Sequence, residues 1–248
     1  MNRAGRTRLD AALVARGLVR SRSQARDAIR RGHVTVAGVR VVRPAVTVPP
    51  DAALTIDDPA AAYVSRAALK LIAALDRFGY AASDLRVLDI GASTGGFTQV
   101  LLERDAAEVV AVDVGRGQLD RRLAADPRVV SHAGLNAREI AASDIDGPFG
   151  AIVADVSFVS LRLVLPPALA LAAPKAWGVF LVKPQFEVGP DRIGKGGIVR
   201  DAGLARRTAE DIAAWLASDM SWSADGVFES PIAGGDGNRE FLIGARRR

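Results

Sequence analysis

A doubly wound, mostly parallel α/β sheet of the Rossmann type, preceded by a small α+β domain, is the fold predicted for this 248-residue chain. Three observations support that prediction. Short apolar runs rich in β-branched residues alternate with segments of helical length from Tyr63 onward, a pattern typical of parallel sheets covered by helices. A glycine-rich loop follows the first of these runs, and the positive charge is concentrated in the first quarter of the chain.

The composition is that of a globular protein and excludes several kinds of chemistry. Apolar residues make up 49% of the chain, which is ample for a core. The chain has no cysteine, so disulfides, cysteine-ligated metals and a thiolate nucleophile are excluded. We expect no secretory signal, because charges interrupt residues 1–17, and no membrane span, because the longest apolar run, residues 163–173, contains two prolines. We therefore expect a cytoplasmic protein, and we expect no metal.

The charge is distributed unevenly along the chain. Residues 1–62 contain eleven arginines and five aspartates, a balance of +6, so residues 63–248 carry −1 of the total of +5. A small basic unit of this kind indicates a polyanionic partner. Nucleic acid is favoured over a membrane, because no amphipathic segment with large apolar residues accompanies the charge.

The basic segment predicts two short helices followed by a β-hairpin. Apolar residues at helical spacing begin the first helix at Leu9. In the second helix, Ser21 and Gln24 have the spacing of a capping box, and Gly32 provides the stop. Residues 33–42 alternate around an Ala-Gly turn, which predicts the hairpin.

Three arginines of the second predicted helix, Arg22, Arg26 and Arg30, recur every fourth residue and should share one face. No acidic partners are interleaved with them, which favours a polyanion-binding face; the alternative is an ordinary solvated face. We expect RNA binding by this face and by further arginines nearby. The predicted set is Arg6, Arg8, Arg20, Arg22, Arg26, Arg30, Arg43 and Arg66.

The run SRSQARDAIRRGHVTVAG, within residues 6–56, resembles the alpha-L RNA-binding fold of a small-subunit ribosomal protein. That resemblance implies that the arginine-bearing helix meets the phosphates and the shape of RNA. The segment 57–62 has no strand alternation and contains a proline, as a linker would. We therefore predict an RNA-binding domain at residues 1–58, a linker at 59–64 and a second domain at 65–248.

The glycine-rich loop, Gly91-Ala-Ser-Thr-Gly95-Gly96, lies between a predicted strand and a predicted helix. Small residues there let the backbone approach a ligand at a helix N-terminus. Asp113 closes the next strand, 22 residues after Gly91, where its carboxylate can accept hydrogen bonds from the ribose of an adenosyl ligand. The alternative is a tight turn with an unrelated strand-end aspartate.

Together, VLDIGASTGGF and Asp113 are similar to motif I of the S-adenosylmethionine-dependent methyltransferases. The resemblance implies S-adenosyl-L-methionine as the cofactor. Asn136, in the loop after the third predicted strand, is a weaker candidate for the adenine side. The predicted cofactor-binding residues are Asp89, Gly91, Ser93, Thr94, Gly95, Gly96, Phe97, Asp113, Asn136 and Asp155.

Absent residues narrow the possible methyl acceptors. Methylation of pyrimidine carbon needs a cysteine, and the Asn/Asp-Pro-Pro-aromatic tetrapeptide of amino-nitrogen methylation is replaced by residues 155–158, Asp-Val-Ser-Phe. Asp155 and Lys183 each follow a predicted strand, which for Lys183 is the run 179–182. Lys70, on a predicted helix, and Glu240, expected to begin the last strand, complete a possible catalytic set. Singly, these residues could be a surface lysine, a strand cap or a solvated glutamate.

Such a set suits a ribose hydroxyl, which is a weak acid and must be oriented for in-line attack on a methyl group. Lys183 either removes the hydroxyl proton or positions the oxygen; the sequence is compatible with both. Phe158 and Phe186 lie just beyond Asp155 and Lys183, where a ring could stack on the cofactor or a flipped base, or pack in the core.

Seven motifs occur in order: YVSRAALKL, GASTGGFTQVLL, VDVGRGQL, ADVSFVSL, LVKPQFEVG, GGIVRD and GNREFL. With the N-terminal domain they resemble the TlyA family, often labelled hemolysin A, which has an FtsJ-like methyltransferase domain. The resemblance implies a seven-stranded sheet, 2′-O-methylation of a cytidine in ribosomal RNA, ribosomal RNA or subunits as partners, and the tetrad Lys70, Asp155, Lys183 and Glu240. No protein partner is predicted.

Three alternatives remain at this stage. A hemolysin-type protein would act on membranes, a non-catalytic assembly factor would only bind ribosomes, and a small-molecule methyltransferase would leave the basic domain without a purpose.

Overall fold

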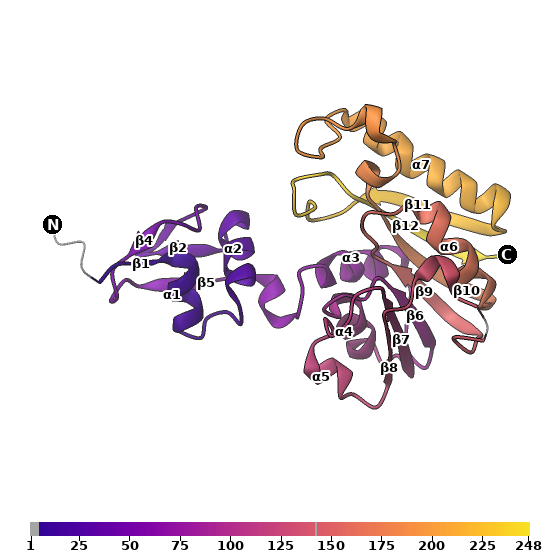
Figure 1. The fold of residues 1–248 in the computed structure, drawn as a ribbon, viewed down its shortest axis with the longest axis horizontal. Coiled ribbons are helices and arrows are strands. Elements are labelled where there is room, and N and C mark those ends of the chain that lie inside the picture. Colours follow the sequence, from indigo (N-terminus) through magenta and orange to yellow (C-terminus); the bar gives the residue numbers. More distant parts are fainter. Residues whose placement is uncertain (1–4, 142) are drawn as a thin grey trace. The chain divides into compact units, whose positions relative to one another are not determined.

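The computed structural model of the protein describes residues 5–141 and 143–248. The chain divides into two compact units, Met1–Arg66 and Ala67–Arg248, which are drawn in Figure 1 and are described separately below. The first four residues of the predicted domain 1–58, and of the segment expected to lack a signal, lie outside the described residues. The exact domain and linker bounds, 58 and 59–64, stay predictions.

The N-terminal unit contains two helices and two small sheets. Strands β1 and β4 pair antiparallel, and β2 pairs antiparallel with both β3 and β5. Its elements are β1 Thr7–Arg8, α1 Leu9–Ala15, α2 Arg22–Arg31, β2 Val34–Val36, β3 Val39–Arg40, β4 Thr47–Val48, β5 Leu54–Ile56 and the 3-10 turn η1 Pro59–Ala62.

Local sequence accounts for the limits of α2 and for the hairpin. Ser21 Oγ accepts a hydrogen bond of 3.2 Å from the Gln24 amide, as the capping-box spacing predicts. Gly32 ends the helix in the left-handed conformation, with φ 80°. The predicted hairpin is confirmed: β2 and β3 flank Ala37 and Gly38, which both have positive φ.

The C-terminal unit is built on a seven-stranded sheet with the order β11-β12-β10-β9-β6-β7-β8. The strands from β10 to β8 in this order are parallel to their neighbours, whereas β12 is antiparallel to β10 and β11. The predicted mostly parallel, seven-stranded α/β fold is therefore confirmed. Its strands are β6 Arg86–Ile90, β7 Glu108–Asp113, β8 Val129–Ala133, β9 Phe149–Ala154, β10 Ala172–Val182, β11 Trp222–Glu229 and β12 Phe241–Arg247.

Helices cover both faces of this sheet (Figure 1). Leu88 and Ile90 of β6 belong to a buried cluster with residues of α6 and α7. Asp89, between them on the strand, points to the opposite face and accepts a hydrogen bond from Thr98 of α4. The helices are α3 Ala68–Phe78, α4 Gly96–Glu103, α5 Arg121–Ala124, α6 Leu161–Ala170 and α7 Ala202–Asp219, with 3-10 turns η2 Ala137–Glu139, η3 Pro184–Phe186 and η4 Pro190–Arg192.

Two strand limits differ from the predicted ones. Strand β10 begins at Ala172 rather than at Val179, and its pairing with β9 shifts register between Ala172 and Trp177. Glu240 was expected to begin the last strand but lies one residue before it. The long run at 163–173 is mostly helix α6, and no helix in the described part of the chain is long and apolar enough to cross a bilayer.

Candidate functional site

The carboxyl ends of the parallel strands form the wall of a pocket of about 530 Å³. Among the residues that line it are Gly91 after β6, Asp113 at the end of β7, Asn136 after β8 and Asp155 after β9. Ligands of doubly wound sheets bind at this edge. The structure thus brings together residues that the sequence assigned to a cofactor from four separate stretches of the chain.

Gly91 is required by the close approach of two strand ends. Its φ is +79°, and a Cβ at this position would lie 2.5 Å from the carbonyl oxygen of Asp155. The two strands are joined there, since the Asp155 amide donates to the carbonyl oxygen of Ile90 at 3.0 Å. The missing side chain therefore allows the loop to turn while β6 and β9 stay paired.

Asp113 ties the glycine-rich loop to the next turn. Its Oδ2 accepts a 2.8 Å hydrogen bond from the Ser93 amide, and its Oδ1 accepts a 2.7 Å hydrogen bond from the Gly115 amide. Each carboxylate oxygen has a second acceptor position. Asp113 can therefore hold the loop and still accept hydrogen bonds from a ligand in the pocket that it lines.

Asp89, on strand β6, binds helix α4 and does not line the pocket. Its side chain is fully buried, Oδ2 accepts a 2.6 Å hydrogen bond from Thr98, and Oδ1 has no hydrogen-bond partner among the described residues. Burial raises the pKa of Asp89 to about 7; the Thr98 hydrogen bond opposes the shift, and the negative charge of Asp155 adds to it.

The remaining loop residues have other positions. Phe97 is buried, and Gly95 is the N-cap of α4, packed so that a Cβ would meet the Leu123 side chain. Of the predicted cofactor residues, Gly91, Ser93, Asp113, Asn136 and Asp155 line the pocket, whereas Asp89, Thr94, Gly95, Gly96 and Phe97 do not.

The four predicted catalytic residues form two ion pairs. Lys70 Nζ lies 2.5 Å from Glu240 Oε2, and both side chains are almost completely enclosed, with 6% and 3% exposed. Lys183 Nζ lies 2.7 Å from Asp155 Oδ1, at a slightly more open position. This contact is an ion pair without the geometry of a hydrogen bond, because Asp155 Oδ1 has no hydrogen-bond partner among the described residues. The Lys183 ammonium donates its hydrogen bond to Ser157 Oγ, at 2.7 Å.

Strand pairing places both ion pairs at the same edge of the sheet. Val182, the last residue of β10, pairs with Phe241, the first residue of β12. Lys183 follows the one strand and Glu240 precedes the other, so the two residues lie beside each other. Lys183 does not line the pocket, but its partners Asp155 and Ser157 do. The Lys183 ammonium is thus held against the wall of the pocket.

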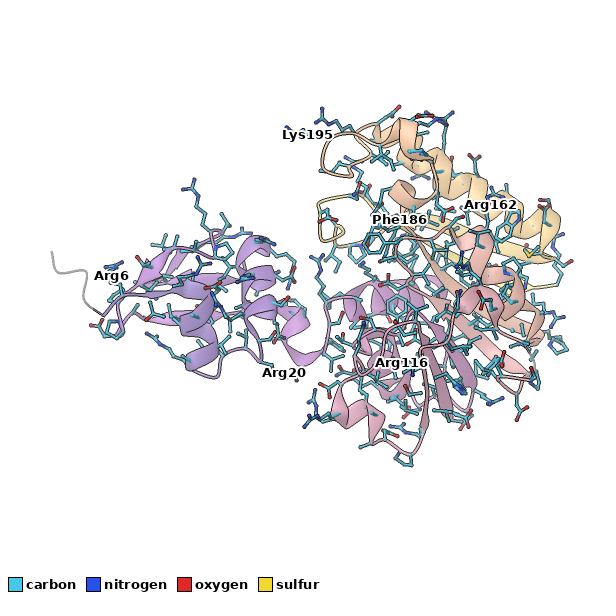
Figure 2. All side chains as sticks on the ribbon, in the orientation of Figure 1. Arg6, Arg20, Arg116, Arg162, Phe186 and Lys195 are labelled. Atoms are coloured by element: carbon cyan, nitrogen blue, oxygen red, sulfur yellow. The ribbon has the colours of Figure 1, made fainter. Side chains whose placement is uncertain are left out.

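Two aromatic rings, Phe158 and Phe186, lie at the same edge of the sheet. The Phe158 side chain is 90% exposed at a positive φ of 64°, and its ring centroid lies 5.1 Å from that of Phe186. Figure 2 labels Phe186 beside the C-terminal strands. Phe158 does not pack in the core, so the packing alternative is wrong for this residue.

Sequence reasoning missed Glu187 and Ser157. Glu187 accepts hydrogen bonds from Ser160 Oγ at 2.6 Å and from the Leu161 amide at 2.8 Å, which joins η3 to the start of α6. Burial raises the pKa of Glu187, although these hydrogen bonds oppose the shift. Both residues lie inside motifs that the sequence shows, LVKPQFEVG and ADVSFVSL, but only tertiary contacts reveal their partners.

In the N-terminal unit, the inference that the arginine face has no acidic partner is wrong. Asp10 of α1 is fully buried and pairs with Arg8, Arg22 and Arg26 at 3.1, 3.2 and 3.0 Å. The Arg8 hydrogen bonds hold the pKa of Asp10 well below its usual range; burial opposes this, and Arg26 and Arg22 reinforce it. The acid comes from another helix, so the spacing within α2 did not reveal it.

The other predicted RNA-binding arginines differ in their contacts. Arg66 pairs with Asp27 at 2.7 Å, and Arg6 donates to the carbonyl oxygen of Thr47 at 2.7 Å. Figure 2 shows Arg6 and Arg20 far apart on the unit. The side chains of Arg20, Arg30 and Arg43 have no protein partner within the described ranges.

Comparison with known proteins agrees with both halves of this description. The family model for FtsJ-like methyltransferases matches residues 63–247, and that for S4 domains matches residues 7–54. A Mycobacterium tuberculosis protein named 16S/23S rRNA (cytidine-2′-O)-methyltransferase TlyA is 48% identical over 98% of this chain and 91% of its own.

Two further relatives carry a different name. Hemolysin A of Brachyspira hyodysenteriae is 37% identical over 95% of this chain and 98% of its own. A solved structure from Streptococcus thermophilus, described as a candidate hemolysin, superposes with a TM-score of 0.77 at 38% identity, covering 98% of this chain and 89% of its own.

Proposed function

We infer the function from one premise: this chain belongs to the TlyA family, whose C-terminal part is an FtsJ-like methyltransferase domain. We propose that it transfers a methyl group from S-adenosyl-L-methionine to the 2′-hydroxyl of a cytidine ribose in ribosomal RNA. The observation that carries this proposal is the Lys183–Asp155 ion pair at the wall of the pocket that Asp113 also lines.

The pocket fits an adenosyl ligand. Asp113 would accept hydrogen bonds from the ribose hydroxyls, Asn136 would lie on the adenine side, and the backbone at Gly91 and Ser93 would face the methionine part. The close approach at Gly91, which a Cβ would prevent, supports this assignment. When bound, S-adenosyl-L-methionine supplies an electrophilic methyl group beside Asp155.

The tetrad would prepare the acceptor. The Lys183 ammonium, held by Asp155 and Ser157, would donate a hydrogen bond to the ribose 2′-oxygen and orient its lone pair toward the methyl group. As the methyl–oxygen bond forms and the methyl–sulfur bond breaks, the 2′-hydroxyl proton would leave to the Asp155 carboxylate, whose Oδ1 has no hydrogen-bond partner among the described residues, or to water. Lys70 and Glu240, which neutralise one another next to this position, would add a fixed dipole without net charge. No metal is needed in this arrangement.

The exposed Phe158 ring offers a surface for a nucleobase. Base stacking on an aromatic side chain is a common mode of RNA recognition. The Phe158 ring contacts that of Phe186 and still remains exposed. An extruded cytidine could therefore stack there while its ribose reaches Lys183.

The N-terminal S4 domain would hold the RNA. Its arginines contact phosphates, which supplies affinity and orientation, while the site in the second unit selects the nucleotide. Ribosomal subunits or their free RNA are the proposed partners, and the cytoplasm, where these reside, is the proposed compartment.

The test is transfer of tritiated methyl from the cofactor to unmodified ribosomal subunits and to free ribosomal RNA, with modified riboses mapped by their protection from alkaline hydrolysis. We expect label at a cytidine 2′-oxygen. Lys183→Ala should lower the rate of methyl transfer by about a hundredfold or more and leave RNA binding intact. Absence of label in all RNA, with cofactor binding demonstrated, would refute the activity and leave the assembly-factor alternative.

The hemolysin name of some relatives yields a separate test. Leakage of dye-filled liposomes by the purified protein, independent of cofactor, would support a membrane-acting function. We expect no leakage, because the features of the site described above serve cofactor and acceptor binding.

A further inference from the structure

The N-terminal unit contains two buried aspartates that bind arginines, and they differ in one respect. Asp10 and Asp58 have 0% and 1% of their side chains exposed. Asp58 is held by Arg31, whose side chain is only 15% exposed, so this pair is an internal brace. The arginines on Asp10 are 45–50% exposed, so they bind a buried carboxylate and face solvent at the same time.

The geometry of the Asp10 cluster leaves donors free. Arg8 uses Nε and Nη2 on the two carboxylate oxygens at 3.1 Å each, Arg22 uses Nη2 alone, and Arg26 uses Nε alone. A guanidinium has five N–H groups. Each of the three therefore keeps Nη1 and other N–H groups that meet no protein acceptor among the described residues.

The Asp10 carboxylate also reduces the repulsion among the three guanidinium groups. Three guanidinium groups that converge without an anion repel each other and spread apart, whereas Asp10 draws them onto one point. The cluster keeps a net charge of +2, because three positive charges surround one negative charge. That charge and the free planar N–H groups match two neighbouring phosphodiesters, which arginine binds through paired hydrogen bonds.

We propose that Asp10 is a positioning residue for RNA, which gathers Arg8, Arg22 and Arg26 into one site for two adjacent backbone phosphates. This inference rests on the proposed function, since it takes the ligand to be RNA. It assigns to a buried acid, in a unit of net positive charge, an effect on RNA affinity.

Asp10→Asn separates this proposal from simple charge counting. The substitution removes a negative charge, so the charge of the protein rises by one, and a charge-count account predicts tighter RNA binding. If Asp10 positions the arginines, binding weakens, by about tenfold or more for the loss of one or two charge-assisted contacts. The slope of log affinity against log salt concentration should also fall by roughly one.

Asp58→Asn is the matched control. It removes an equally buried carboxylate from the same unit and adds the same charge, but the arginine that it releases is the enclosed Arg31. The asparagine oxygen can still accept the hydrogen bond that Asp58 accepts from the Ala60 amide. We expect its RNA affinity to equal or exceed that of the wild type. The probe is in vitro transcribed ribosomal RNA, and the full-length protein is titrated at several salt concentrations.

A second pair of variants keeps the proposal testable if Asp10→Asn unfolds the unit, as far-UV circular dichroism would show. Arg22→Lys keeps the charge but loses the planar guanidinium that bridges Asp10 and a phosphate, so affinity should fall several-fold. Arg31→Lys makes the same exchange in the Asp58 brace and should leave RNA affinity within about twofold of wild type, since the enclosed Arg31 side chain, unlike the half-exposed Arg22, does not face solvent.

The outcomes separate the two proposals. A folded Asp10→Asn protein that binds RNA as tightly as the wild type, or tighter, would overturn the positioning role while wild-type methyl transfer stands. Equal losses in Arg22→Lys and Arg31→Lys would overturn it as well. A wild type that binds the cofactor but neither binds nor methylates RNA would instead refute the proposed function.

Discussion

At the residue scale, the Lys70–Glu240 ion pair raises the question of why a buried charge pair is present. Both side chains are enclosed, and burying two charges incurs a desolvation cost that their attraction often only offsets. Apolar residues of similar volume usually serve stability as well or better. The pair therefore favours a role in the chemistry of the site rather than in folding.

A double variant tests that role. Glu240→Gln leaves the Lys70 ammonium buried without its partner, and we expect it to lower the free energy of unfolding by about 3–5 kcal/mol. Lys70→Met combined with Glu240→Gln removes both charges and should recover most of this stability, yet methyl transfer should stay lost. Denaturant unfolding and transfer of tritiated methyl measure the two effects, and an active double variant would show that the pair is structural.

At the scale of elements, the site depends on how closely two strand ends approach. Strands β6 and β9 are paired up to their last residues, Ile90 and Ala154. The loop that follows β6 begins at Gly91, directly beside the carbonyl group of Asp155. Gly91 allows this passage, because its backbone has a positive φ and no side chain occupies the gap. The shape of the pocket that we assign to the cofactor thus depends on β6–β9 pairing combined with one glycine.

Gly91→Ala should therefore distort the pocket, because the added Cβ is affected both by the positive φ and by a steric clash. The left-handed conformation costs an alanine about 1–2 kcal/mol, and the clash with the Asp155 carbonyl adds to that cost. Gly79→Ala is the control, since Gly79 has φ +65° with nothing within 4 Å of its Cβ position. We expect Gly91→Ala alone to lose cofactor affinity in calorimetric titration; equal binding by both variants would contradict the role of the close approach.

At the scale of the whole molecule, the buried carboxylates of the two units should respond to pH in opposite ways. In the N-terminal unit, hydrogen bonds from arginines lower the pKa of Asp10 and, against its burial, that of Asp58. Stability from these carboxylates is complete above their ordinary pKa of about 4 and is lost as pH falls below it. In the C-terminal unit, the pKa of Asp89 is raised to about 7. The unfolded chain there releases a proton that the folded chain keeps, so stability falls as pH rises from about 4 to about 7.

Fluorescence can separate these responses. The three tryptophans, Trp177, Trp215 and Trp222, all lie in the C-terminal unit, whereas far-UV circular dichroism detects both units. We expect tryptophan-detected unfolding free energy to fall by on the order of 4 kcal/mol between pH 4 and pH 7, and Asp89→Asn to flatten that dependence. Below pH 4, circular dichroism should show a larger loss than tryptophan emission, because the C-terminal carboxylates with a lowered pKa, Asp126 and Asp201, lie outside the core and contribute little. A pH-independent tryptophan signal would refute the assignment to Asp89.

The sequence by itself determined the elements and many of the residues of the site, because these depend on local patterns. The apolar runs and the glycine loop specify strands that must end at one edge of a parallel sheet, and this order alone places Gly91, Asp113 and Asp155 together. The limits of helix α2 likewise follow from Ser21 and Gly32, whose effects reach only a few residues.

Only the tertiary structure decided which charges meet. Lys70 and Glu240 are 170 positions apart, and their pairing depends on an antiparallel β12 entering beside β10. Asp10 meets Arg22 and Arg26 because α1 packs on α2, which no spacing within either helix reveals. The physical reason is the same in both cases: a hydrophobic period fixes which face of an element is buried, but the partner of a charge depends on how two elements approach each other.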